Sequence, residues 1–312
     1  MGHLVQTMAY RNATPWHGLG NPLSENQPLE VWLREAGMQW RICESAVQYH
    51  AAADLHAFDQ HKVLYRSDTR EPLSVVSKRY QVVQPSEVLE FYRDLVEAGG
   101  FELETAGVLK GGRKLWALAR TGQHAVLKGG DAVKGYLLLA TACDGSLATT
   151  AQFTSVRVVC NNTLQMAVDN TTGAVKVPHS TRFDPDAVKK QLGIAVSTWD
   201  HFIYRMKQLA ARPVSQSEAS VFIKAVFASP NISGQAAERV NDSVIALFNG
   251  KAMGANLESA SATAWGLLNA VTEFVDHSRR AHSPGNRLDS AWFGQGLTLK
   301  QRALDSAVAL LA

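Results

Sequence analysis

The sequence has few cysteines and no long apolar run. Cys43, Cys143 and Cys160 show no CxxC spacing, which argues against a disulfide framework or a structural zinc site and favours a reducing compartment. No segment reaches the roughly 20 apolar residues of a membrane-spanning helix, and the first residues lack an apolar signal core. We therefore expect a cytoplasmic protein with no membrane association.

The motifs of several enzyme classes are also missing. The Gly-Gly pairs at 99, 111 and 129 do not form G-x-G-x-x-G, and no G-x-x-x-x-G-K-[ST] occurs, which argues against a nucleotide-hydrolysing motor and a dinucleotide oxidoreductase. The cluster His50, His56 and His61 lacks the i, i+4 spacing of helical zinc ligands. Ser146 follows a turn signal and lacks the G-x-S-x-G context of a nucleophile. The sequence predicts no catalytic residue, cofactor or metal site.

An excess of one charge is absent from the chain as a whole but present in one part of it. The 31 Lys and Arg residues against 28 Asp and Glu residues leave +3, unlike a protein that coats duplex DNA over its whole surface. Residues 1–104 carry −5, residues 105–183 carry +6 and residues 184–312 carry +2. Positive charge is therefore concentrated in the middle of the chain, where the sequence is most strand-like.

Two groups of strands are predicted in the first half of the chain. The segments from Gln39 to Val83, and from Phe101 to about Val159, are rich in β-branched and aromatic residues separated by turn formers. The turn signals at 110–112 and 144–145 predict that the second group forms four strands in two hairpins. The continuous apolar run Tyr136–Ala140 predicts a strand that is covered on both faces.

Helical spacing predicts helices near 29–36 and 85–95 and dominates after Asp184. One long helix from Asp184 to Leu209 is followed by four more helical windows, for five helices in about 130 residues, and Ser283-Pro284-Gly285 is among the breakers between them. The predicted fold class is α+β. An N-terminal mixed antiparallel sheet with packed helices and basic strands occupies residues 1–180, and an all-helical domain occupies residues 181–312.

The strand Arg113–Thr121 contains the pattern most typical of nucleic-acid binding. Alternation places Lys114, Trp116 and Arg120 on one face. Single-stranded nucleic acid is bound by cations that contact phosphates and by exposed rings that stack on bases. A strand whose Trp116 faces the core fits equally well, so that alternative stays open. The predicted nucleic-acid-binding residues are Lys110, Arg113, Lys114, Trp116, Arg120, Lys128, Lys134 and Arg157.

Three short clusters combine aromatic, polar and small residues: 14–18, 153–163 and 287–294. A polar network that fixes parts of the fold explains them, because a buried Arg157 or Asn161 needs hydrogen-bond partners and Asp289 is a candidate partner. The residues predicted for this structural polar network are Trp16, His17, Asn161, Asp289 and Trp292.

The same clusters carry a family resemblance. Together with segments 77–85, 99–107 and 144–146, they resemble the phage/plasmid-like protein family, a domain of unknown function, over essentially the whole chain. The resemblance implies a protein of a mobile genetic element, encoded by phages, conjugative plasmids or laterally transferred islands. It implies no established activity.

The leading hypothesis is a non-enzymatic single-stranded DNA-binding protein of a phage or plasmid, which acts as an oligomer in recombination, annealing or protection of transferred DNA. Two alternatives remain. The first is a counter-defence or regulatory protein that binds a host protein. The second is an enzyme whose site uses Cys160, Arg157 or Asp289, which a solvent-open pocket holding all three would favour.

Overall fold

The computed structural model describes most of the chain and divides it into two units. The described residues are 5–11, 20–97, 100–157, 159, 162–165, 167–168, 171–172, 174–192, 196–228 and 234–311. Unit 1 comprises residues 1–122, 136–153 and 174–194, and unit 2 comprises residues 123–135, 154–173 and 195–312. Each unit is therefore built from segments that are not contiguous in sequence.

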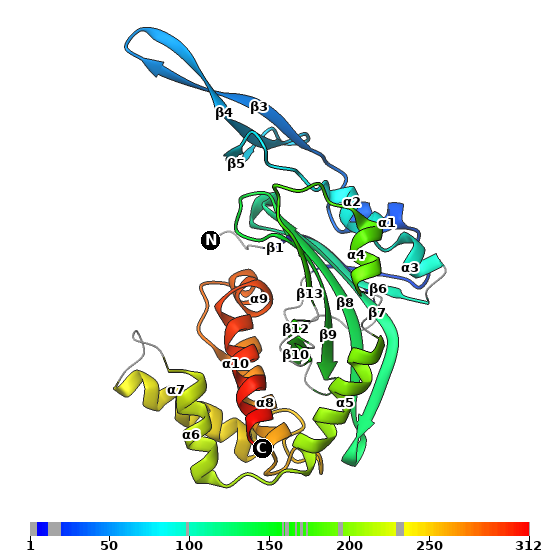
Figure 1. Ribbon diagram of the computed structural model, residues 1–312, viewed down its shortest axis with the longest axis vertical. Helices are drawn as coiled ribbons and strands as arrows, with labels where there is room; N and C mark the ends of the chain where they lie inside the picture. The colour runs from blue at the N-terminus through cyan, green and yellow to red at the C-terminus, as the bar shows by residue number, and fades with distance from the viewer. Residues whose placement is uncertain are drawn as a thin grey trace. The chain divides into compact units, whose positions relative to one another are not determined.

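The largest sheet has eight strands and is mixed (Figure 1). Its order is β10-β9-β8-β7-β6-β1-β2, and β13 also pairs with β9. The strands are β1 (Val5–Arg11), β2 (Asn21–Leu23), β6 (Glu102–Leu109), β7 (Lys114–Leu127), β8 (Asp131–Ala142), β9 (Thr149–Arg157), β10 (Asn162–Gln165) and β13 (Ala174–Val177). The pair β1–β2 is parallel, whereas β1–β6, β6–β7, β9–β10 and β9–β13 are antiparallel.

Glycine-containing turns join the sheet's hairpins at the two predicted positions. The turn between β6 and β7 is η1 (Lys110–Gly112), in which Gly111 and Gly112 have φ of +69° and +104°. A Cβ on Gly112 would lie 2.9 Å from the Trp40 ring, so glycine is required there by space as well as by backbone conformation. Gly145, between β8 and β9, has φ +77°. Both predicted hairpins are confirmed.

A second sheet of three strands belongs to unit 1. It consists of β3 (Ile42–Ala51), β4 (Asp54–Arg66) and β5 (Pro72–Ser77), in that order and antiparallel. Figure 1 shows β3 and β4, in blue, as a long hairpin. Every residue from 51 to 60 is exposed, so the end of this hairpin has no covering layer.

The core of unit 1 brings its helices against its strands. Its helices are α1 (Leu29–Glu35), α2 (Pro85–Glu90), α3 (Arg93–Glu97) and α4 (Pro185–Leu192). Pro85 is at the first helical position of α2, and a capping box between Gln84 and Glu87 satisfies its first N–H groups. Phe91 and Tyr92 are fully buried, and the Tyr92 hydroxyl lies 2.8 Å from the Ala117 carbonyl oxygen.

The apolar run of β8 is buried on both faces, as the sequence predicts. The residues from Tyr136 to Ala140 are at most 4% exposed. The helix predicted for 29–36 is also confirmed as α1, which ends at Glu35 and is followed by Ala36 as C-cap and by Gly37 with φ of +69°. The predicted helix at 85–95 is instead two short helices, α2 and α3.

Unit 2 is mainly helical. Its helices are α5 (Val196–Ala211), α6 (Gln216–Val226), α7 (Gln235–Ala246), α8 (Ala264–Glu273), α9 (Pro284–Phe293) and α10 (Gln295–Ala309). π-helical turns extend α7 as η4 (Leu247–Lys251) and α8 as η5 (Phe274–Ser278), and a two-stranded sheet joins β11 (Ala167–Val168) and β12 (Thr171–Thr172). Helix α8 is buried along its whole length and contacts α5 and α10, so it forms the centre of this unit.

One helix prediction requires correction, and another is described only in part. The residues predicted as one long helix over 184–209 contain α4 and α5, and residues 193–195 between them lie outside the described residues. The segment 283–285, predicted as a breaker, is the start of α9. The Ser283 hydroxyl accepts a hydrogen bond from the Asn286 backbone N–H at 3.1 Å, and Pro284 occupies the first helical position. Ser-Pro therefore starts a helix here, because serine caps the first turn and proline at that position needs no N–H partner.

Candidate nucleic-acid interface

The residues predicted to bind nucleic acid are divided between the two units. Lys110, Arg113, Lys114, Trp116 and Arg120 belong to unit 1. Lys128, Lys134 and Arg157 belong to unit 2.

The strand face that was expected to bind single strands is buried. Trp116 is 1% exposed and Lys114 is 4% exposed. The residues of β7 from Lys114 to Ala119 are buried on both faces of the strand. The alternation in the sequence therefore does not separate a solvent-exposed face from a buried face. Trp116 thus has the core position that the sequence left open as an alternative, and its ring is not available to stack on a base in this conformation.

Arg120 is half-buried and already paired. Its Nη2 donates to Glu104 Oε2 at 2.6 Å, and the Tyr136 hydroxyl donates to the other carboxylate oxygen at 3.0 Å. Burial and the neighbouring Glu104 carboxylate raise the pKa of Tyr136. The Arg120 cation is therefore neutralised within unit 1.

Arg157 is buried in a closed network of unit 2. Its side chain is 2% exposed, and Nε donates to the two carboxylate oxygens of Asp131 at 2.8 and 3.0 Å. Asp131 also accepts from Ser259 Oγ at 2.7 Å and from Trp265 Nε1 at 2.9 Å. Burial opposes the negative charge of Asp131, but the bonds from Arg157, Ser259 and Trp265 outweigh it, and the pKa of Asp131 is lowered. In this conformation, the Arg157 guanidinium is therefore buried inside unit 2 and is not exposed for contact with a phosphate.

A second buried ion pair lies in the same unit. Lys300 Nζ donates to Asp276 Oδ1 at 2.8 Å and to Thr163 Oγ1 at 2.6 Å, and the Lys300 side chain is 2% exposed. Thr163 N–H donates to Asp276 Oδ2 at 3.0 Å. Charged hydrogen bonds thus fix the segment after β9 to the helices of unit 2, and no sequence motif pairs Lys300 with Asp276.

The polar-aromatic clusters are only partly described. Trp16, His17, Asn161 and also Cys160 lie outside the described residues. Asp289 and Trp292 are half-buried on α9, where the Trp292 and Phe293 rings meet edge to face with centroids 6.1 Å apart.

Cys143 is a buried thiol at the end of β8. It is 5% exposed, and burial raises its pKa to about 12. Because the thiolate is the nucleophilic form, this environment keeps the cysteine unreactive. Within the described ranges, no group of three or more His, Cys, Asp or Glu residues is placed to hold a metal ion.

Four segments of unit 1 that are far apart in sequence meet at one end of the sheet. The Tyr80 and His179 rings stack with centroids 4.4 Å apart, and the Tyr80 hydroxyl donates to the Ala142 carbonyl at 2.7 Å. A ring nitrogen of His179 lies 3.0 Å from the Leu147 carbonyl oxygen. The Cys143 N–H donates to the Arg113 carbonyl at 2.8 Å. These contacts join segments 77–81, 110–113, 142–147 and 178–182, which we call the basic edge.

The basic edge carries exposed cations. It contains five Lys and Arg residues and one acidic residue, Asp144, for a net charge of +4. Lys78, Arg79, Arg113 and Arg182 are exposed, and none of these four has an ion pair with a described residue. Tyr80 and His179 are half-buried, so part of their stack reaches the surface. Cations beside a partly exposed ring pair form the kind of surface that the sequence pattern predicts for Lys114, Trp116 and Arg120 of β7.

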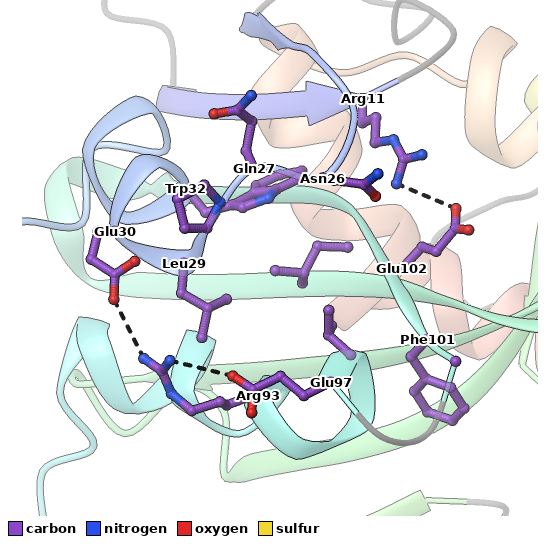
Figure 2. Close-up of a pocket in the computed structure, with 14 residues that line it drawn as sticks. Arg11, Asn26, Gln27, Leu29, Glu30, Trp32, Arg93, Glu97, Phe101 and Glu102 are labelled. Carbon is purple, nitrogen blue, oxygen red and sulfur yellow. Dashed lines mark ion pairs between the residues drawn. The ribbon is translucent and has the colours of Figure 1, made fainter.

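Figure 2 shows a cavity of about 380 Å³ in unit 1 that has the opposite character. Arg11 faces Glu102, with Nη1 and Oε2 3.3 Å apart, and Arg93 lies 3.6 Å from both Glu30 and Glu97. Two arginines are thus balanced by three glutamates. The cavity does not suit a polyanion, because its cations are already neutralised.

The β3–β4 hairpin exposes apolar rather than cationic side chains. Tyr49 is 51% exposed, Leu55 55% and Phe58 44%. From Cys43 to Lys62 the formal charge is −2. This surface would repel nucleic acid, so it is not part of the candidate interface.

Together these features define a mixed α+β protein with a basic edge on unit 1 and buried charge networks in unit 2. No helix in the described part of the chain is long and apolar enough to cross a membrane.

The chain belongs to the family described as a domain of unknown function (DUF932), whose model matches residues 72–292. Neither a search of curated proteins nor a search of solved structures gave a match.

Proposed function

We propose that the protein binds single-stranded DNA through the basic edge of unit 1. The observation that carries this proposal is the group of four exposed, unpaired cations around the Tyr80–His179 stack. Cations supply sequence-independent contacts to phosphates, and a ring pair at the surface supplies a platform for bases. The setting that the family resemblance implies, a phage or plasmid, gives such a protein a role in recombination, annealing or protection of transferred DNA.

The size of the effect follows from the number of cations. Each phosphate contact on a single strand contributes about −0.7 to the slope of log K against log salt concentration, so four contacts give about −2.8. Raising the salt concentration fourfold then weakens binding about 50-fold. A protein that binds through a small basic surface is thus expected to have moderate affinity and a moderate salt dependence.

The test is fluorescence anisotropy of a labelled single strand at low salt with Arg79→Glu and Arg113→Glu. Each variant is expected to weaken binding about tenfold or more. Arg34→Glu is the matched control, because Arg34 is an exposed arginine of unit 1 that forms an ion pair with the adjacent Glu35 and does not belong to the basic edge. If Arg34→Glu and Arg79→Glu weaken binding of the single strand equally, the basic edge is not the binding surface and the proposal is wrong.

Binding of a protein partner is a second candidate function, favoured by the exposed Tyr49, Leu55 and Phe58 of the β3–β4 hairpin. Apolar side chains exposed on an acidic hairpin are typical of protein interfaces, and here they are on both faces, because Tyr49 pairs with His56 and Leu55 with His50. A triple serine variant at these positions is expected to lose a stoichiometric host partner that the wild type retains after nuclease treatment. Retention of that partner by the variant would exclude this surface.

A further inference from the structure

A cavity of about 360 Å³ in unit 2 has apolar walls and a cationic rim. It lies where the end of α6, α7, η5 and α10 meet. Its walls are Phe227, Val240, Phe274 and Leu299, and Arg279, Arg280 and Arg302 stand around it. No acidic residue is among the described residues that line it.

The three arginines have no carboxylate partner in the described part of the chain. Arg279 is half-buried, with Nη1 3.4 Å from Ser290 Oγ and Nη2 donating to Gln295 Oε1. Burial lowers the pKa of Arg279, which means that its charge is desolvated without a compensating anion. Buried cations in proteins are usually paired, so this environment lacks a negative group.

The other two arginines differ in how far the fold already occupies them. Arg302 Nη1 donates to the carbonyl oxygens of Val226, the last residue of α6, at 2.9 Å and of Ala228, two residues further on, at 3.2 Å. Its position at the rim is therefore fixed. Arg280 is exposed and has no hydrogen bond or ion pair in the described structure, so it can turn toward a ligand.

The walls fit a ring or a compact apolar group. Phe227 and Phe274 meet edge to face, with centroids 5.5 Å apart and ring planes at 87°. Both are buried, as is Leu299. A volume of this size is in the range of small-molecule sites, which combine apolar walls with a few charged groups that orient the ligand.

We propose that this cavity binds an organic phosphate of nucleotide size, with its phosphate at Arg279, Arg280 and Arg302 and its ring against the apolar walls. Guanidinium groups bind phosphate through paired N–H donors, and a phosphate dianion balances several arginines better than a single carboxylate does. This site goes beyond the proposed DNA binding, because it lies in unit 2 and shares no residue with the basic edge.

The experiment is calorimetric titration of the full chain with AMP, inorganic phosphate and adenosine in separate runs. AMP is expected to bind at least about tenfold more tightly than phosphate or adenosine alone, because only AMP uses both the arginines and the walls. Absence of AMP binding overturns the proposal. Equal affinity for AMP and phosphate, or for AMP and adenosine, also overturns it, because one half of the site then contributes nothing.

Variants locate the binding. Arg280→Gln is expected to weaken AMP binding about tenfold, whereas Arg239→Gln, at an exposed arginine of α7 that does not line the cavity, leaves it unchanged. Arg280 is exposed and unbonded, so its replacement does not threaten folding. Equal weakening by the two variants contradicts the assignment.

Arg79→Glu separates this site from the basic edge. AMP affinity is expected to be unchanged in Arg79→Glu, even though the proposal for DNA predicts weaker binding of a single strand by that variant. A loss of AMP affinity in Arg79→Glu places the nucleotide at the basic edge and overturns the cavity assignment.

Discussion

Replacing Asp131 by asparagine tests the buried charge network of unit 2 most severely. The substitution keeps the shape of the side chain but removes the carboxylate that forms an ion pair with Arg157, at a position where both partners are at most 2% exposed. Breaking a buried ion pair by removing one partner typically costs about 3–5 kcal/mol. We therefore expect Asp131→Asn to lower the free energy of unfolding by about 3–5 kcal/mol.

The double variant shows that the cost comes from an unpaired charge. Arg157→Gln alone leaves the buried Asp131 without its ion-pair partner, whereas Asp131→Asn combined with Arg157→Gln removes both members of the pair. The double variant is expected to cost less than the sum of the two single variants by at least about 2 kcal/mol.

The assay is urea-induced unfolding followed by circular dichroism at 222 nm. Asp305→Asn is the control, because Asp305 is exposed and, among the described residues, bonds only to Gln301 one helical turn away. The control is expected to change the free energy of unfolding by less than about 0.5 kcal/mol. A cost below about 1 kcal/mol for Asp131→Asn, or additive costs in the double variant, refutes the reasoning.

Three further predictions concern pH, packing and reactivity. The pKa of Asp131 is lowered in the fold from its usual 3.8, so its contribution to the free energy of unfolding is full at neutral pH and is lost as pH falls through the lowered value. The difference in unfolding free energy between wild type and Asp131→Asn should therefore shrink in urea curves measured below about pH 4. A difference that stays constant with pH contradicts this. Leu64→Ala, in the core of unit 1, should lower the free energy of unfolding in urea by about 2–5 kcal/mol, whereas Leu55→Ser on the exposed hairpin should lower it by less than about 0.5 kcal/mol. Similar losses for the two variants would contradict the difference in burial between Leu64 and Leu55. Cys143 should resist iodoacetamide at pH 8 in the folded protein and react after unfolding in urea, as measured by mass spectrometry; rapid alkylation of the folded protein would show that burial does not raise its pKa to about 12.

Much of the local structure is predictable from the sequence. The hairpin turns at 110–112 and 144–145 are signalled by glycines that lie at the turns themselves, and the double burial of β8 by an unbroken apolar run. Trp116 could not be assigned in this way, because a strand covered on both faces and a strand with one wet face can share an alternating pattern. Tertiary packing decides between them.

The candidate sites depend on contacts that sequence spacing does not reveal. Asp131 lies 26 residues from Arg157, and neither belongs to a motif that pairs them. The basic edge joins four segments spread over about a hundred residues, and its Lys110 and Arg113 are among the predicted binding residues, whereas Lys78, Arg79 and Arg182 are not. The Lys-Arg-Tyr run at 78–80 is a local signal for Lys78 and Arg79, and no local signal points to Arg182.

Salt-dependent binding of a labelled single strand is the most direct test of the proposed function. We expect binding at low salt with a slope of about −2.8 for log K against log salt concentration, and a slope nearer about −2.1 for Arg79→Glu, because one phosphate contact is lost. No binding at low salt, or the same slope and affinity in Arg79→Glu as in the wild type, would contradict the claim that the basic edge holds DNA.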